Sequence, residues 1–382
     1  MIRRCPNLIR FIHCAGALFD APLGLDDSAK AFQRRQDQKN AFLKIVEDAG
    51  EKKADLVLIT GDLFDRRYVS KSTVDFLMQT CASCPDCKFI IAPGESDYYS
   101  ADSIYALVDI PENVYVFNND ALTRLDFEID GEGVAVYGCA RMSKTVYNDC
   151  VQEFKAESAG SINIVAVNAP ISEQTVSSLV KGGADYCAFA DIGQSAEIFD
   201  EGDMWYSRAG KVEALSFDGV TQGAYVYVQA EKKSGEFVCK PALISCGCKK
   251  YVSVKVNLTG ALKNGDVINA VRDRLDGVEG LGENTLLQVV LTGDVAPEVG
   301  STESAILEMA GEKKVFYTEV IDLTVPIYNH EYLSADPTIK GALFNAFRPA
   351  ICSDDADVRK SATDALRVGL DALNGADLAS AD

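Results

Sequence analysis

Short apolar runs alternate with longer amphipathic segments in the first part of the chain. Residues 8–14, ADLVLITG (54–61) and KFIIAPG (88–94) have the length and continuous hydrophobicity of buried strands. Between them, residues 28–49 and KSTVDFLMQTC (71–81) carry apolar positions at helical spacing. Strands that alternate with helices predict βαβ units, in which a central sheet carries helices on its faces.

The pattern changes along the chain and predicts three parts. LTRLDFEIDGEGVAVYG (122–138) is typical of a hairpin with a turn at DGEG, and further strands continue to about residue 240. We therefore expect an α/β sandwich with mixed sheets over residues 1–245. A new series of strand, helix, strand, helix and strand predicts a small α+β domain at 250–328, and helical periodicity follows at 331–382.

Composition narrows the class of protein. Of the 382 residues, 47% are hydrophobic and 25% charged, which is typical of a folded globular chain. The formal net charge is -20, from 57 acidic and 37 basic residues, and this disfavours tight binding of nucleic acids or anionic lipids. No apolar run approaches the ~18 residues needed to cross a bilayer, so we expect a cytoplasmic protein without a membrane association.

The chain has 12 cysteines, and in a reducing compartment we expect them to be free thiols. CASCPDC places Cys81, Cys84 and Cys87 at intervals of three, a spacing also found in zinc and iron–sulfur sites. The alternative is a plain loop between a helix that ends near Thr80 and a strand at 88–92. The sequence alone leaves both interpretations open.

Polar side chains follow several of the predicted strands. They lie in HCAGALFD (13–20), GDLFD (61–65), GESD (94–97), NAP (168–170) and ADIG (190–193). In open α/β sheets, functional groups collect on loops past the carboxyl ends of strands. We therefore expect a site that these five loops form together.

The order and spacing of these loops resemble the calcineurin-like metallophosphoesterases, and among them the SbcD-like DNA repair exonucleases. The resemblance rests on FIHCAGALFDAPLGL (11–25), ADLVLITGDLFD (54–65) and SADSIYALVDIPENVYVF (100–117), and it covers roughly residues 7–245. It implies a four-layer sandwich, in which mixed β-sheets are flanked by helices, followed by a small α+β capping domain and C-terminal helices.

The family resemblance also implies a pair of metal ions, which clamp a phosphate and generate a hydroxide nucleophile. The positions that would hold the first ion are Gly16, Leu18 and Gly193, and none of these side chains can coordinate a cation. Ser96 stands where the family places a catalytic His, and serine cannot act as an acid near neutral pH. Of the two histidines, His13 is expected in the core and His330 at the surface, so neither replaces these groups.

The positions implied for the second ion keep oxygen-bearing side chains. They are Asp62, Glu95, Asn168 and Asp191, and carboxylates and carboxamides suit Mg²⁺, Mn²⁺ or Ca²⁺. One interpretation is a single site for a hard cation. The other is that no metal binds and that Asp62 organises its loop by accepting backbone N–H groups.

Two functional hypotheses follow from the resemblance. In the first, the chain is an SbcD-like pseudoenzyme that has lost the first metal site and the catalytic His. It would serve as a scaffold or partner-binding protein, with an SbcC-like ATPase or a second copy of the chain as candidate partners and with weak or absent DNA binding. In the second, it is a phosphoesterase or nuclease of low activity that works with one ion, because one ion cannot stabilise both the attacking and the leaving oxygen.

Overall fold

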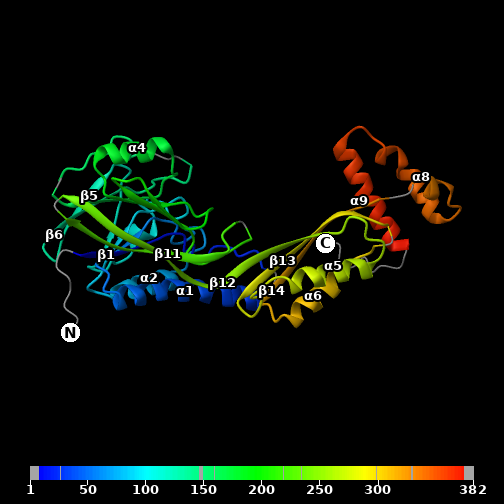
Figure 1. Ribbon diagram of the computed structural model, residues 1–382, viewed down its shortest axis with the longest axis horizontal. Coiled ribbons are helices and arrows are strands. Elements are labelled where there is room, and N and C mark those ends of the chain that lie inside the picture. Colours follow the sequence, from blue (N-terminus) through cyan, green and yellow to red (C-terminus); the bar gives the residue numbers. More distant parts are fainter. Residues whose placement is uncertain are drawn as a thin grey trace. The chain divides into compact units, whose positions relative to one another are not determined.

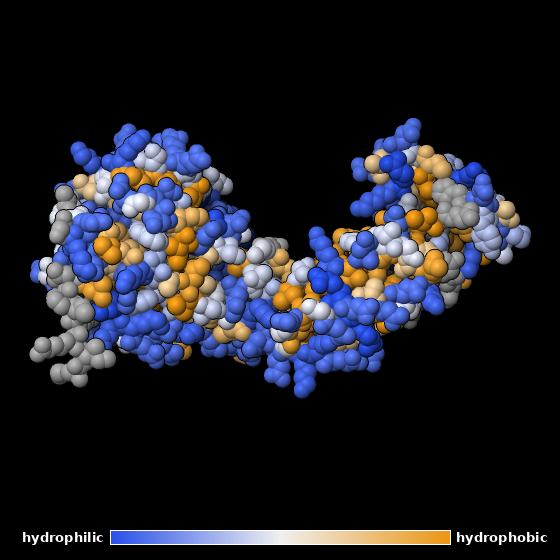
Figure 2. All heavy atoms as spheres, viewed as in Figure 1, coloured by the Kyte–Doolittle hydropathy of each residue, from blue (hydrophilic) through white to orange (hydrophobic). Residues whose placement is uncertain are grey.

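The computed structural model describes residues 8–25, 27–145, 149–158, 160–217, 219–233, 235–297, 299–327 and 330–373. The chain divides into two compact units, Met1–Tyr251 and Val252–Asp382, called here the N-terminal and the C-terminal unit. Among the described residues, none of the helices is both long and apolar enough to span a bilayer. Figure 2 shows that hydrophilic residues cover most of the visible face of each unit, with apolar residues in separate patches.

The N-terminal unit contains two sheets. In the first sheet the strand order is β12-β11-β1-β2-β3-β4, and in the second it is β5-β6-β7-β8-β10-β9. The first sheet has four parallel strands, β1 to β4, with β11 antiparallel to β1 and β12 antiparallel to β11. Its strands are β1 Ile9–Cys14, β2 Leu56–Ile59, β3 Lys88–Ile91, β4 Val114–Val116, β11 Gln222–Lys233 and β12 Glu236–Asn257.

The second sheet combines a parallel centre with antiparallel edges. β6, β7, β8 and β10 run parallel, while β5 and β9 pair antiparallel with β6 and β10. Its strands are β5 Thr123–Ile129, β6 Glu132–Gly138, β7 Ile162–Val167, β8 Tyr186–Ala190, β9 Glu197–Asp200 and β10 Trp205–Ala209. The predicted hairpin is confirmed as β5 and β6, with Asp130 and Gly131 at positive φ in its turn.

Helices cover the outer faces of the two sheets, so that the unit has four layers (Figure 1). α1 (Ser28–Glu51) and α2 (Lys71–Ala82) pack on one face of the first sheet, and α4 (Glu173–Gly182) packs on the second. The sheets pack against each other through apolar side chains that include Phe11, Leu58, Val136, Ile164 and Tyr186. This arrangement confirms the predicted four-layer sandwich; α3 is a single short turn, Ile104–Leu107.

The helix predicted at 28–49 is confirmed as α1, and its first turn shows why it begins there. The side chain of Asp27 accepts hydrogen bonds from the backbone N–H groups of Ala29 and Lys30. Such a cap satisfies N–H groups that have no partner within the helix. From there, Phe42, Ile45 and Val46 face the sheet and are buried.

The predicted strand start near residue 250 is wrong, because one strand, β12, runs without interruption from Glu236 to Asn257. Gly247 lies near the middle of this strand. The glycine lets two backbones approach closely, since a Cβ atom placed on Gly247 would lie 2.7 Å from the backbone nitrogen of Gly223. A shift in pairing register between Gln222 and Ala224 accommodates this contact.

In the C-terminal unit, β13 lies between the end of β12 and β14 and runs parallel to β14. Two helices pack on these strands around a core that includes Val271, Leu287 and Ile306. The three final helices share a separate small core around Phe344, Leu366 and Leu370. The elements are α5 Asn264–Asp276, β13 Thr285–Val295, α6 Glu303–Glu312, β14 Tyr317–Pro326, α7 His330–Ala335, α8 Ile339–Ile351 and α9 Ala356–Leu373.

Candidate functional site

The loop after β2 brings Asp62 to the carboxyl end of the first sheet. Gly61 and Asp62 both have positive φ, of 92° and 54°. A Cβ atom on Gly61 would lie 2.6 Å from Cα of Gly94 and 2.8 Å from Nδ2 of Asn168. Glycine is therefore required here, because the loops after β2, β3 and β7 meet at this point.

The carboxylate of Asp62 is almost fully buried, with 3% of the residue exposed, and both oxygens accept hydrogen bonds. Oδ1 accepts from the backbone nitrogen of Ser96 at 2.8 Å, and Oδ2 accepts from Nδ2 of Asn168 at 2.9 Å. These donors satisfy a buried carboxylate that would otherwise be costly to desolvate.

Asn168 presents its nitrogen, rather than its oxygen, to Asp62. The same Nδ2 also donates to the backbone oxygen of Thr60 at 2.9 Å. Two acceptors therefore determine the orientation of the amide, since a flipped side chain would place its oxygen against both of them. A cation would bind to the amide oxygen of Asn168. In the observed orientation, Asn168 instead acts as a hydrogen-bond donor.

Asp97, the last residue of GESD, was not identified from the sequence, yet it holds two of the loops together. Its side chain is fully buried. Oδ1 accepts from the backbone nitrogens of Asp62 (2.9 Å) and Gly94 (2.7 Å), and Oδ2 accepts from the backbone nitrogen of Leu63 (3.0 Å) and from the Tyr105 hydroxyl (2.7 Å). Burial, and then the negative charge of Asp62, raise the pKa of Asp97 to about 6, so it is ionised at neutral pH.

The other two candidate ligands are less constrained. Glu95 is exposed, and Asp191 is partly buried with Oδ1 accepting from the backbone nitrogen of Gly193 at 3.2 Å. A cavity of about 510 Å³ contains all four predicted residues. Its lining is Asp62, Glu95, Ser96, Arg141, Asn168, Ala169, Pro170, Ala190, Asp191 and Ile192.

The structure thus brings the four oxygen-bearing residues to one cavity. It does not bring their carboxylates together: in the part of the chain that the structure describes, no three His, Cys, Asp or Glu side chains form a group that could hold a metal ion. Cys81, Cys84 and Cys87, which all lie among the described residues, likewise form no such group, so the metal interpretation of their spacing finds no support. α2 ends at Ala82 and β3 begins at Lys88, as the alternative interpretation predicted.

The positions implied for a first metal ion are on an apolar side of the same site. Gly16 has a φ of 62°, and a Cβ atom placed on it would lie 2.6 Å from Cγ2 of Ile192. Ile192 packs against the buried side chains of Ala15, Ala190 and Ala209. There is consequently no room for a longer side chain at position 16 unless Ile192 moves.

Leu18 and Gly193 complete that side without offering ligand atoms. Leu18 has a φ of 47°, and its backbone nitrogen donates to the backbone oxygen of Asp62 at 2.9 Å. The side chain of Gln38, in α1, donates to the backbone oxygens of Ala17 and Leu18. These hydrogen bonds hold the loop through its backbone.

A second cavity, of about 330 Å³, shares Glu95 and Ser96 with the first and is lined by cationic side chains. Arg66 lies over the ring of Tyr98, 4.1 Å from its centroid, and Arg67 forms two hydrogen bonds to the carboxylate of Asp65. The sequence DRR directly after GDLF was the available signal for these residues. The lining is Asp65, Arg66, Arg67, Glu95, Ser96, Tyr98 and Lys144.

His13 is confirmed as a core residue. It is fully buried, with Nδ1 2.6 Å from the Ser207 hydroxyl and Nε2 2.9 Å from the Thr60 hydroxyl. Burial lowers the pKa of His13 to about 3, so the imidazole is neutral and takes no part in the site. The side chain of His330 lies outside the described residues.

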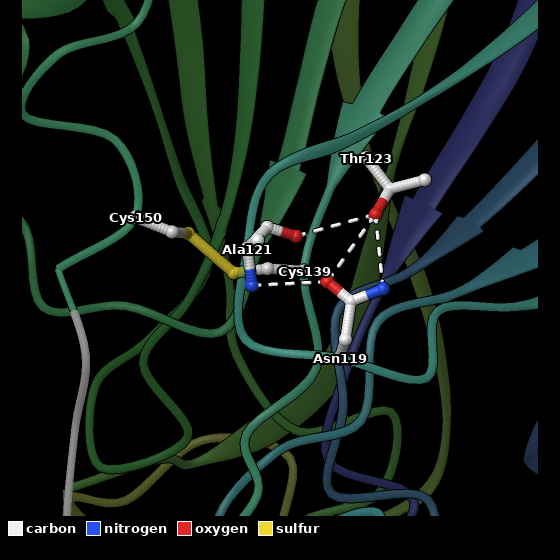
Figure 3. The surroundings of a disulfide bond; sticks show 5 residues. All are labelled: Asn119, Ala121, Thr123, Cys139 and Cys150. Atoms are coloured by element: carbon white, nitrogen blue, oxygen red, sulfur yellow. Dashed lines mark hydrogen bonds between the residues drawn. A yellow bond between two sulfur atoms is a disulfide. The ribbon is translucent and has the colours of Figure 1, made fainter.

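The expectation that the cysteines are free thiols is wrong for one pair. Cys139, directly after β6, forms a disulfide with Cys150 (Figure 3). The loop between them carries Arg141 and Lys144. The neighbouring loop is fixed by Asn119, whose side chain accepts from the backbone nitrogen of Ala121. Spatial proximity decides such pairing, and nothing in the spacing of these two cysteines indicated it.

Comparisons with known proteins find several solved structures with low similarity to this chain. Among solved structures, a protein of Thermus thermophilus has 13% identity and a TM-score of 0.38, with 61% of this chain and 98% of that chain covered. A dimetal phosphatase from Danio rerio has 10% identity and a TM-score of 0.40, with 64% and 99% covered. Vacuolar protein sorting 29 from Cryptosporidium parvum has 10% identity and a TM-score of 0.29, with 62% and 98% covered.

A search of curated proteins finds no match to this chain. The family model described as calcineurin-like phosphoesterase matches residues 12–195, which include the end of β1, all of β2 and β3, and the loops that form the cavity. Over residues 12–195, slightly less than half of its length, the chain is therefore similar to the calcineurin-like phosphoesterase family.

Proposed function

We propose that the chain is an SbcD-like pseudoenzyme, a phosphoesterase fold that acts by binding and not by hydrolysis. The observation that carries the proposal is the contact between Gly16 and Ile192. In the family pattern, position 16 supplies a carboxylate to the first ion, and here a Cβ atom at that position would lie 2.6 Å from an Ile192 methyl group. The dinuclear centre of the family does not fit these residues.

The hydrogen bonds of Asp62 support the same proposal. A bridging carboxylate has to direct its oxygens to cations, whereas both oxygens of Asp62 accept N–H groups, from Ser96 and Asn168. Asp97 and the backbone of the loop after β1 complete a network that is satisfied without metal. Such a network keeps the loops in place after the chemistry has been lost.

The second candidate function is a phosphoesterase or nuclease of low activity with one Mg²⁺, Mn²⁺ or Ca²⁺ ion. It is favoured by the cavity that contains Asp62, Glu95, Asn168 and Asp191, all of which carry oxygen atoms. To bind an ion there, Asn168 would have to turn its oxygen inward and give up both of its hydrogen bonds. This cost makes the pseudoenzyme the better-supported proposal.

A pseudoenzyme of this type needs a binding partner, and we include an SbcC-like ATPase or a second copy of the chain in the proposal. The final helices would provide the contact surface, since α8 and α9 keep exposed apolar residues, Ile339, Val358 and Val368. Independent DNA binding is expected to be weak because of the net charge of -20.

The decisive experiment is hydrolysis of bis-p-nitrophenyl phosphate by the full chain with Mn²⁺ or Mg²⁺. We expect no metal-dependent turnover by the wild type and no difference from Asp62→Ala. Asp65→Ala is a matched control, because Asp65 lies in the same loop but binds Arg67 outside the first cavity. Metal-dependent turnover that Asp62→Ala abolishes and Asp65→Ala preserves would reject the pseudoenzyme in favour of the single-ion enzyme.

A further inference from the structure

Cys84 and Cys87 are at the two ends of a tight turn between α2 and β3. The backbone nitrogen of Cys87 donates to the backbone oxygen of Cys84 at 3.1 Å, with Pro85 and Asp86 at the two central positions. The Cα atoms that such a turn joins lie within ~7 Å of each other. A disulfide spans about 4.4–6.8 Å between Cα atoms, so the turn geometry suits one.

The side chain of Asn113 holds this turn in place. Its Nδ2 donates to the backbone oxygens of Cys81 (2.9 Å), Cys84 (3.0 Å) and Cys87 (3.1 Å). Only 6% of Asn113 is exposed, so the clamp is shielded from water. Asn113 therefore holds the backbone of the turn, and with it both cysteines, in place.

The two cysteines differ in access to solvent. Cys84 is partly exposed, while Cys87 is fully buried in the core between α1, α2 and the first sheet. A hydrogen bond from the Cys87 thiol lowers the pKa of Cys84 to about 7, although burial and the charge of Asp86 oppose this effect. The same contact and burial raise the pKa of Cys87, so at neutral pH the thiolate is at the accessible position.

We infer that Cys84 and Cys87 form a redox-active dithiol, in which Cys84 attacks a small disulfide from solvent and Cys87 resolves the mixed disulfide. The inference rests on the turn, the Asn113 clamp and the contrast in exposure. It is independent of the proposed function, since neither cysteine lines the two cavities.

The reaction with oxidised glutathione is balanced as follows. The thiolate of Cys84 attacks one sulfur of the glutathione disulfide, whose S–S bond breaks and releases a glutathione thiolate that takes up a proton. Cys87 then loses its proton and attacks the Cys84 sulfur, so that the mixed disulfide breaks and a second glutathione leaves. The protein thiols are oxidised to a disulfide, and the glutathione disulfide is reduced to its two thiols.

The test uses the full reduced chain with Cys352→Ser, which removes an exposed thiol. After incubation with oxidised glutathione at pH 7.5, we expect peptide mapping to find a Cys84–Cys87 disulfide. Cys87→Ser should instead accumulate glutathione on Cys84. Cys84→Ser should slow oxidation of Cys87 about ten-fold or more, because the remaining thiol is buried and protonated. Cys81→Ser, in the same region, is the matched control and should keep the wild-type rate.

Several results would overturn the inference. The first is a lasting mixed disulfide on wild-type Cys84, which would show that Cys87 does not resolve it. The second is that Cys84 and Cys87 remain reduced in a sample in which Cys139 and Cys150 have been oxidised to their disulfide. The third is an unchanged rate of Cys87 oxidation in Cys84→Ser. Because Cys84 is partly exposed, this substitution is expected to disturb folding less than one at Cys87. Circular dichroism of each variant shows that it is folded before its thiols are scored.

Discussion

The two sides of the principal cavity differ in what holds them together. On the side of Asp62, carboxylates accept N–H groups from three loops, and Asp97 alone accepts from four donors. On the side of Gly16, apolar contacts replace polar ones, and Ile192 occupies the space that a side chain at position 16 would need. The comparison teaches that buried acidic residues can stabilise a set of loops through hydrogen bonds, whereas the other side of the same cavity depends on apolar packing.

The largest effect is expected for Asp97→Ala, on the polar side. This substitution leaves three buried backbone N–H groups and the Tyr105 hydroxyl without their acceptor. We expect the free energy of unfolding to fall by about 3–5 kcal/mol, measured by urea denaturation. Glu95→Ala, which alters an exposed neighbour, is the control, and equal losses in both variants would contradict the role assigned to Asp97.

Gly16→Asp tests the apolar side. It places a side chain at positive φ and against Ile192, and we expect a loss of about 2–4 kcal/mol in the free energy of unfolding. Gly24→Asp is the matched control, because Gly24 has a φ of 60° with no atom within 4 Å of a Cβ, so it reports the backbone strain alone.

The difference between these two variants isolates the contact with Ile192. Combining Gly16→Asp with Ile192→Ala should recover part of the lost stability, which a double-mutant cycle measures. If Gly16→Asp is no worse than Gly24→Asp, the apolar side has room for a ligand and the proposed loss of the first ion is in doubt.

Asn168→Asp replaces the donor between Thr60 and Asp62 with an acceptor. At pH 7.5 we expect a loss of about 2 kcal/mol in the free energy of unfolding, from two missing hydrogen bonds and repulsion between carboxylates. The neighbouring charge raises the pKa of the new carboxyl in the folded state, so the penalty is present at pH 7.5 and shrinks as the pH falls towards 5.

Urea denaturation of wild type and Asn168→Asp at both pH values measures this change. A penalty that does not depend on pH would show that the new carboxylate has turned away from Asp62. If Mn²⁺ stabilises the variant but not the wild type, the amide of Asn168 is the group that prevents a single ion from binding in the cavity.

The smallest effect is expected for Ser96→Ala, at the position where the family has a catalytic His. Ser96 contacts Asp62 through its backbone nitrogen, which alanine keeps. The free energy of unfolding should change by less than about 0.5 kcal/mol. Ser96→Pro, which removes the N–H group, should cost more, and equal effects of the two substitutions would contradict the backbone role.

The sequence was informative wherever local patterns decide structure. Continuous apolar runs predicted β1, β2 and β3, and the DGEG turn predicted the hairpin of β5 and β6. The family resemblance also named Asp62, Glu95, Asn168 and Asp191, which line one cavity. They follow β2 and β3 of the first sheet and β7 and β8 of the second.

The features that could not be predicted depend on contacts between distant segments. Asp97 follows the candidate ligand Glu95 in GESD, yet its importance comes from its hydrogen bond to the loop of Asp62, 35 residues away. The space beside Gly16 is filled by Ile192, and the orientation of the Asn168 amide depends on the Thr60 carbonyl. No periodicity encodes such side-chain geometry.

The disulfide between Cys139 and Cys150 closes a covalent ring, and this ring contains Arg141 and Lys144, one cation from each cavity lining. Because a closed ring of this size reduces the conformational entropy of the unfolded chain, it is expected to stabilise the folded state by about 3 kcal/mol. The disulfide thereby holds both positive charges within one short closed loop. A reductant such as dithiothreitol would break the disulfide. It would thereby free Arg141 and Lys144 together and alter the linings of both cavities without any substitution.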